Sequence, residues 1–339
     1  MSTLSRRAFS TLALSALGSH GLGHCLAQGR ETRSETRVVL LLTGVITDGG
    51  WSQLAFNGLK TLGAERGFKT AFAENIGLAQ MQEVVRGYAD DGFDLLLGHG
   101  FEFSSALLDI APDYPSQKFF VTSYLPQPTV PGNILYIDLG YFGAAYGAGA
   151  LAALISERKQ AVGFVGGEDD PNQQRIQKCF IAAARNTVRG IQGLGIITGD
   201  YDNAAKGREA ASTLIGNGAD VIWHAADVTG LGAIQGAVAG KAKVLGCYSD
   251  QTNLAPHNMA TSFEMNLGGM VQTVAHAVAN HTFAGGREWK PAVDWMWLLK
   301  AGARGDHNPQ LVSPPQWSAF QKVWSDLSAG KIDLSPWVS

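Results

Sequence analysis

The feature that most constrains the fold of this chain is a repeated alternation of short apolar runs with longer segments of helical periodicity. In the first third of the chain, the alternation predicts strands at 38–42, 69–73, 94–98 and 118–123, and helices at 51–66, 78–91 and 103–111. Strands that alternate with helices in this way require right-handed crossovers, and hence a parallel sheet covered by helices.

A second alternation follows a proline-bearing segment at 125–132. It predicts strands at 134–138, 161–165, 195–198, 221–223 and 244–247, and helices at 141–155, 171–188, 204–216 and 230–239. After residue 250 the pattern returns to the first unit, with a strand at 259–263 and a helix at 267–280, before a strand at 295–299 and a last helix at 315–329.

Two similar halves indicate an α/β protein with two doubly wound, Rossmann-like lobes and a cleft between them. We expect lobe 1 to comprise residues 37–124 and 252–290, and lobe 2 to comprise 125–251 and 291–339. Repeated crossing between the lobes predicts a multi-strand hinge, which suits closure around a ligand.

Residues 1–27 have the features of an export signal. Arg6 and Arg7 stand in a segment that resembles the twin-arginine motif, and small residues at 25 and 27 fit cleavage after Ala27. A lipoprotein would modify Cys25, but His24 is a poor match to the small residue wanted before it. We therefore expect a periplasmic protein exported by the twin-arginine pathway, with lipid anchoring as the alternative.

Composition excludes several other classes of function. The chain has 339 residues, is 45% apolar and 16% charged, and carries a formal net charge of −3, so nothing indicates a nucleic-acid partner. No segment after the leader reaches the ~20 uninterrupted apolar residues of a membrane span. Cys179 and Cys247 either pair or remain buried free thiols, and their spacing favours the thiols.

Signals for catalysis, metals and cofactors are weak. The chain has no GxSxG elbow and no P-loop, and its histidines lack ligand spacing, so we expect no catalytic residue, no metal and no cofactor. The glycine-rich run 230–236 misses the dinucleotide fingerprint because its third glycine falls one position late. Close packing at the start of a helix explains that run better.

Polar and aromatic side chains gather at the carboxyl ends of the predicted strands, where open α/β sheets bind ligands. Aromatic planes can sandwich a ring, while carboxylates and amides recognise its polar edge. The pattern therefore predicts capture of a small planar ligand. The candidate residues from the strand ends are Asp48, Trp51, Gln53, Phe101, Ser123, Tyr201, Trp223, Asp227 and Asp250.

Several of these candidates have a structural alternative. Trp51 can anchor its helix to the sheet, and Tyr201 stands in a turn that fits a helix N-cap. Trp223 ends an apolar strand and suits the core equally well, whereas Asp227 can cap the helix that follows it. Asp250 sits with a glutamine in a turn directly after a strand.

An ordered set of short elements resembles the basic membrane protein family, which comprises substrate-binding proteins of ABC importers for purine nucleosides and related rings. The resemblance extends over about residues 37–336. The elements are DGGWSQ at 48–53, GHGF at 98–101, GG at 166–167, YDNAAKG at 201–207, AADVTGLG at 225–232, YSDQ at 248–251 and TS at 261–262.

The resemblance implies the type I periplasmic binding protein fold and assigns roles to particular positions. Trp51 and Tyr201 occupy the positions of the two aromatics that sandwich the base, and Asp250 corresponds to the aspartate that takes ribose hydroxyls. This chain departs from the family pattern at three positions. Ser52 replaces the usual Asn, Asp227 stands where Gly is common, and Glu264 replaces the Lys of many nucleoside binders.

A carboxylate at 264 that faces the ligand would favour a donor-rich edge, such as that of an amino-purine. The resemblance thus implies a monomeric, non-enzymatic periplasmic protein that binds a purine base or nucleoside and docks on an ABC permease in the inner membrane. Alternatives are a sensory protein that presents its ligand to a receptor and a binder of another ring, such as a flavin. An enzyme on the same scaffold would need a reactive pair that we do not find.

Overall fold

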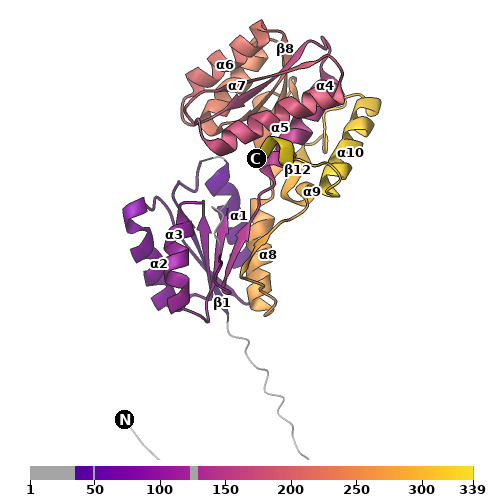
Figure 1. Ribbon diagram of the computed structural model, residues 1–339. Helices are drawn as coiled ribbons and strands as arrows, with labels where there is room; N and C mark the ends of the chain where they lie inside the picture. Colours follow the sequence, from indigo (N-terminus) through magenta and orange to yellow (C-terminus); the bar gives the residue numbers. More distant parts are fainter. Residues whose placement is uncertain (1–34, 49, 123–128, 339) are drawn as a thin grey trace, which may run out of the picture. The chain divides into compact units, whose positions relative to one another are not determined.

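The computed structural model describes residues 35–48, 50–122 and 129–338 (Figure 1). The predicted export signal at 1–27 and the candidate Ser123 lie outside these residues. Within them, strands and helices alternate and form two six-stranded sheets.

Sheet 1 is parallel throughout, with strand order β11-β5-β4-β3-β1-β2. Its first strand shows how the sequence builds the sheet: Val38, Leu40 and Leu42 enter one hydrophobic cluster, whereas Val39 and Leu41 enter another. The last five positions of this strand are all apolar, and they are buried on both faces of the sheet. The strands are β1 (Thr36–Leu42), β2 (Phe68–Ala73), β3 (Leu95–His99), β4 (Lys118–Thr122), β5 (Ile134–Ile137) and β11 (Arg287–Trp289).

Two pairs of helices cover the faces of sheet 1. Figure 1 shows α2 and α3 on one side, with α1 and α8 on the other. The helices are α1 (Trp51–Gly63), α2 (Met81–Asp90), α3 (Phe103–Ile110) and α8 (Leu267–Ala279).

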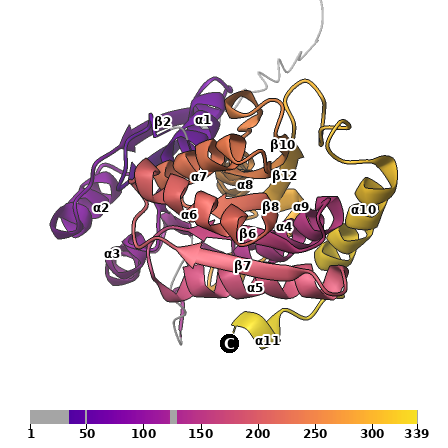
Figure 2. The ribbon, with the colours of Figure 1, turned by 90° about the horizontal axis from the view of Figure 1, so that it is seen from above.

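Sheet 2 has strand order β12-β10-β9-β8-β6-β7, and only its edge strand β12 is antiparallel. Helices α6 and α7 lie side by side over one face (Figure 2), and α4 and α5 pack on the other. The strands are β6 (Ala161–Gly166), β7 (Gln192–Ile197), β8 (Ala219–Ala225), β9 (Lys243–Tyr248), β10 (Met259–Met265) and β12 (Trp297–Lys300). The helices are α4 (Tyr141–Ile155), α5 (Pro171–Thr187), α6 (Ala204–Gly216), α7 (Asp227–Ala239), α9 (Val293–Met296), α10 (Pro314–Ser328) and α11 (Ser335–Val338).

The strand pairings correct the predicted lobe boundaries. The sequence predicts 134–138 in lobe 2, but β5 pairs with β4 in sheet 1. It predicts 259–263 in lobe 1, but β10 pairs with β9 in sheet 2. Both segments are short buried strands, and nothing in such a run specifies which sheet it joins. The chain therefore passes between the sheets after β5, β10 and β11.

The glycine-rich run at 230–236 allows α7 to pack closely against α6, in agreement with the predicted close packing at the start of a helix. A Cβ added at Gly232 would overlap the Ala204 carbonyl at the start of α6, and one at Gly236 would lie 2.8 Å from the Arg208 carbonyl oxygen. Helices α6 and α7 thus meet backbone to backbone. Elsewhere, Cys179 and Cys247 are both buried free thiols.

Candidate functional site

A cavity of about 290 Å³ lies where strands of both sheets end. Four segments contribute to it: the β1–α1 loop, the β7–α6 loop, the first turns of α7 and the loop after β9. The lining residues are Thr43, Gly44, Asp48, Gly50, Trp51, Ser52, Asp202, Asp227, Val228, Leu231, Cys247, Tyr248, Ser249 and Gln251.

Asp48 organises the β1–α1 loop. Its carboxylate accepts hydrogen bonds from the backbone N–H groups of Gly50 at 2.9 Å, Ser52 at 2.7 Å and Gln53 at 3.0 Å. The first N–H groups of a helix have no partner within the helix, and a carboxylate satisfies them well. Much of the hydrogen-bonding capacity of the Asp48 carboxylate is therefore occupied by the N-terminus of α1. Gln53 does not line the cavity.

Trp51 is held by a buried histidine. Its ring stacks on the His99 ring, with centroids 4.1 Å apart and planes inclined by 21°. A carbonyl can only accept, so His99 donates from Nε2 to the Trp51 carbonyl at 3.0 Å, and its Nδ1 lies 3.2 Å from the Thr122 hydroxyl. Burial lowers the pKa of His99 to about 4, which keeps the imidazole neutral. The stack fixes Trp51 at the cavity wall.

Asp227 is the first residue of α7 and has a φ of +43°, in the left-handed region. Its carboxylate makes no hydrogen bond to the start of the helix, so it does not cap α7. The residue is exposed, and it lines the cavity. Desolvation of the carboxylate, followed by repulsion from Asp48 and Asp202, raises the pKa of Asp227 to about 6.

Replacing Asp227 with Gly should raise the free energy of unfolding by about 1 kcal/mol near neutral pH, because Gly adopts a left-handed backbone without the Cβ clash. The lost repulsion adds only a few tenths of a kcal/mol, since the accessible carboxylate is screened. A carboxyl whose pKa rises from 3.8 to about 6 on folding stabilises the fold at low pH and loses that contribution as pH rises through 6.

The gain from Asp227→Gly should therefore be largest above about pH 6 in urea unfolding. Asp227→Asn separates the two causes, because it removes the charge but keeps a Cβ at a left-handed position. A glycine variant no more stable than the parent near neutral pH would contradict the assignment of strain to this residue.

Tyr201 lies beside the cavity but not on its wall. Its ring packs against Gly167, where an added Cβ would overlap it. The hydroxyl donates to Asp170 Oδ2 at 3.3 Å and accepts from Gln173 Nε2 at 3.1 Å. Burial raises the pKa of this phenol. The residue on the wall is its neighbour Asp202.

Asp250 and Glu264 are engaged in shaping the loop after β9. Asp250 accepts from the backbone and hydroxyl of Thr252 at 3.0 and 2.6 Å and from the Gly302 N–H at 3.0 Å. Glu264 accepts from the Asp250 N–H at 3.2 Å. Neither residue lines the cavity.

The two remaining candidates also lie away from the cavity wall. Trp223 is 0% exposed and stacks on Phe180 in the core, with centroids 5.8 Å apart. Trp223 is therefore a core residue, which is the alternative that the sequence analysis gives for it. Phe101 is 54% exposed and lines no part of the cavity.

The candidate list omitted residues that the structure places on the wall. Tyr248 ends β9 with a φ of +70° and meets Tyr141 edge to face. Gln251 accepts at Oε1 from the Cys247 N–H at 3.0 Å and from His224 Nε2 at 2.9 Å. From this region the strand-end rule predicts Asp250, whereas the residues on the wall are Tyr248, Ser249 and Gln251. Val228 and Leu231, 40% and 38% exposed, supply apolar wall from α7.

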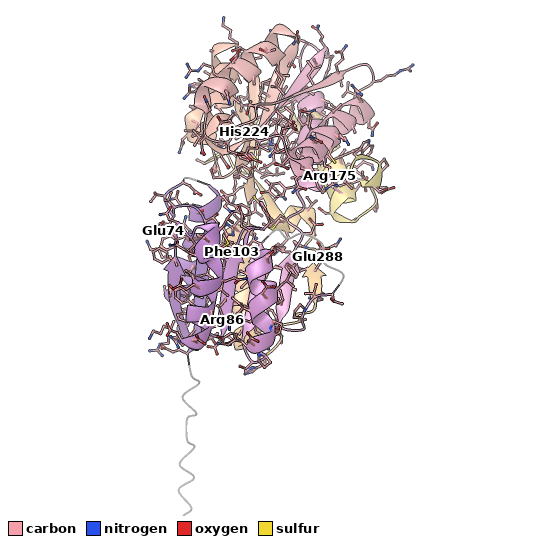
Figure 3. All side chains as sticks on the ribbon, turned by 60° about the vertical axis from the view of Figure 1, so that its left-hand side comes forward. Glu74, Arg86, Phe103, Arg175, His224 and Glu288 are labelled. Atoms are coloured by element: carbon pink, nitrogen blue, oxygen red, sulfur yellow. The ribbon has the colours of Figure 1, made fainter. Side chains whose placement is uncertain are left out.

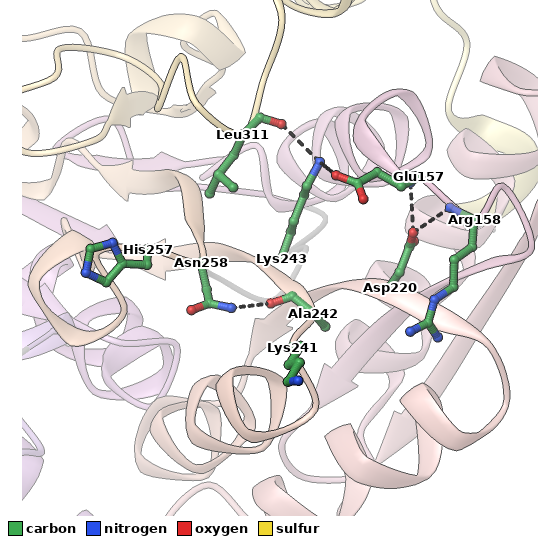
Figure 4. A pocket seen from close by; sticks show the side chains of 9 residues that line it. All are labelled: Glu157, Arg158, Asp220, Lys241, Ala242, Lys243, His257, Asn258 and Leu311. Carbon is green, nitrogen blue, oxygen red and sulfur yellow. Dashed lines mark hydrogen bonds and ion pairs between the residues drawn. The ribbon is translucent and has the colours of Figure 1, made fainter.

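A second crevice, of about 260 Å³, lies at the opposite ends of the sheet 2 strands (Figure 4). Lys243 there donates to the carbonyls of Ile155 and Leu311 at 3.0 and 3.2 Å and pairs with Glu157 at 2.9 Å. These bonds tie strand starts to neighbouring loops, so we assign this crevice a structural role. Among the described residues, no group of three His, Cys, Asp or Glu could hold a metal ion.

The two sheets, with a cavity where their strands end, define the class of protein by its fold, an α/β binding protein. The fold is similar to that of a solute-binding protein of an ABC transporter system from Aeropyrum pernix K1, with a TM-score of 0.74 and 19% identity over 88% of this chain and 92% of that chain. The expected periplasmic binding protein fold is thereby confirmed.

Residues 35–295 match the family of PnrA-like ABC transporter substrate-binding proteins (Bmp), and the chain belongs to this family. Basic membrane protein A1 of Borrelia garinii subsp. bavariensis is 25% identical over 78% of this chain and 79% of its own length. The ABC transporter nucleoside-binding protein BmpA of Lactococcus lactis subsp. cremoris is 25% identical over 71% and 74%.

Membership of this family establishes a solute-binding rather than an enzymatic class, and it implies a small-molecule ligand and a permease partner. Substrate-binding proteins of ABC importers are exported to the periplasm. Within the described residues, every helix is too short or too polar to cross a membrane.

Proposed function

We propose that this protein delivers a purine base or nucleoside, or a related planar heterocycle, to an ABC permease of the inner membrane. It binds the ring in the cavity at the strand ends, as a monomer, after export by the twin-arginine pathway. Movement about the segments that connect the sheets then encloses the ligand.

The stack of His99 on Trp51 is the observation that carries this proposal. The stack occupies one face of the indole, and Trp51 also lines the cavity. Ring contacts of this kind favour flat ligands. Tyr248, rather than Tyr201, supplies a second aromatic side chain on the wall. A cavity of about 290 Å³ is near the lower end of ligand pockets, which suits a small ring compound.

Similarity to a named nucleoside-binding protein supports the choice of ligand class. The test is mass spectrometry of the small molecule released when the purified protein is denatured, followed by calorimetry with adenosine, guanosine, adenine, hypoxanthine and riboflavin. We expect at least one to bind with micromolar affinity or better. Failure of all of them, with no ring compound released on denaturation, would overturn the proposal while leaving the family and fold intact.

Trp51→Ala should weaken binding of that ligand by about 2 kcal/mol, or about thirtyfold, because the variant loses the stacking surface. Trp337→Ala is the matched control, since Trp337 packs on Tyr146 away from the cavity. Calorimetry of both variants checks the prediction. Equal affinities in the two variants would assign Trp51 to packing alone.

A further inference from the structure

The charge of the cavity wall goes beyond what a neutral nucleoside requires. Asp48, Asp202 and Asp227 line it, and no Lys, Arg or His occurs among the lining residues that the structure describes. The nearest ion pair in sequence, Lys206 with Asp200 at 3.1 Å, involves no lining residue. Three observations identify the cavity as the candidate ligand site: its volume, its position at the strand ends and the family of the chain. The three carboxylates on its wall then determine which charge the ligand should carry.

Two of the three carboxylates are free to meet a ligand. Asp48 already accepts three backbone N–H groups. For Asp202 and Asp227, by contrast, no hydrogen bond or ion pair to the carboxylate is found in the described part of the chain. Closing a cavity over an unpaired carboxylate costs several kcal/mol, whereas an opposite charge offsets that cost.

The aromatic groups of the wall agree with this preference, whereas the amide of Gln251 does not add to it. Both donors that reach Gln251, the Cys247 N–H and His224 Nε2, end on its Oε1, so the acceptor of that amide is already occupied and does not serve a cation. His224, labelled in Figure 3, is buried and neutral, since burial lowers its pKa to about 4. Trp51 and Tyr248 provide π faces, which attract cations as well as rings.

We infer that the ligand of this cavity is a planar ring that carries a positive charge, and that Asp227 is the residue that selects for the charge. This inference rests on the proposed function, because it specifies the chemistry of the ring bound at the same site. Asp227 suits the role because it combines an unpartnered carboxylate with a place on the wall of the cavity that Trp51 also lines.

The groups that face Asp227 set its response to pH. Asp48 comes from the β1–α1 loop, Asp202 from the β7–α6 loop, and Tyr141, Tyr201, Cys247 and Tyr248 from α4, the β7–α6 loop and β9. All of these groups are acids, and none of them carries a positive charge that would stabilise the ionised carboxylate of Asp227. A bound cation would supply that charge. Protonation of Asp227, with a pKa of about 6, should therefore weaken binding of a cation as pH falls from about 7 to about 5.

The probes are two matched pairs: 1-methyladenosine, a cation near neutral pH, with its neutral isomer N6-methyladenosine, and 1-methylnicotinamide with neutral nicotinamide. Calorimetry should give at least tenfold tighter binding of the cation in one pair or both. Asp227→Asn should reduce affinity for that cation by about tenfold and flatten its pH dependence. Asp109→Asn, an exposed carboxylate on α3, controls for the change in net charge.

Each outcome decides the inference. Equal or tighter binding of the neutral partners overturns it and leaves the proposed function standing, as does a cation preference that survives unchanged in Asp227→Asn. Binding of a neutral purine, with no detectable binding of either cation, also overturns it. Failure of every ring compound, charged or neutral, instead removes the proposed function itself.

Discussion

Acidification from about pH 7 to about pH 4 should remove about 3 kcal/mol of stability for each of His99 and His224, in addition to the usual loss from carboxylates. Both side chains are 1% exposed, and burial lowers both pKa values from 6.5 to about 4. A pKa difference of one unit corresponds to about 1.4 kcal/mol.

The sign follows from the charge of the imidazole. Each histidine is neutral in the folded protein but gains a proton in the unfolded chain below pH 6.5. Their contribution to stability is therefore complete above pH 6.5 and is lost as the pH falls toward 4. Because His99 supports Trp51 and His224 contacts Gln251, the same pH range should disturb the cavity wall.

Urea unfolding across this pH range checks the prediction. His99→Gln and His224→Gln should each reduce the difference in stability between about pH 7 and about pH 4 by about 3 kcal/mol. His281→Gln, at an exposed position, controls for removal of an imidazole. A pH dependence as steep in both variants as in the parent would contradict the role assigned to these histidines.

The order and type of the main elements could be predicted from the sequence because each strand is an apolar run and each long helix has its own periodicity. The predicted helices at 141–155 and 204–216 match α4 and α6 at both ends. By contrast, β11 is a three-residue strand at a sheet edge, with the sequence Arg-Glu-Trp. Because it contains no apolar run, its sequence does not predict a strand.

The site was predictable in position but not in detail. The rule that ligands bind beyond strand carboxyl ends located Asp48, Trp51 and Asp227 on the wall. The rule could not distinguish side chains that line the cavity from side chains that form hydrogen bonds within the loops. Asp250 is of the second kind, since its carboxylate accepts hydrogen bonds from Thr252 and Gly302. That difference depends on loop conformation, including the left-handed backbone at Tyr248.

Helix α6 meets α7 so closely that one methyl group should separate them. A Cβ at Gly207 would overlap the Thr229 carbonyl oxygen and lie 3.0 Å from the Ala233 nitrogen, and neither backbone atom can swing away. Gly207→Ala should therefore cost about 3 kcal/mol, even though alanine favours a helix by about 1 kcal/mol. Gly216, at the end of the same helix, has nothing within 4 Å of an added Cβ.

Gly216→Ala is thus the matched control, and it should leave stability unchanged or raise it by up to about 1 kcal/mol. The two variants have identical composition, so their urea midpoints isolate the helix contact. Gly207→Ala should also weaken ligand binding, because Thr229 links α7 to the Tyr201 carbonyl at 2.8 Å and to the Asn203 N–H at 2.9 Å, beside the cavity. Equal urea midpoints for the two variants would show that α6 can move to accommodate the added methyl group. That result would contradict the role of the α6–α7 contact in holding the cavity wall.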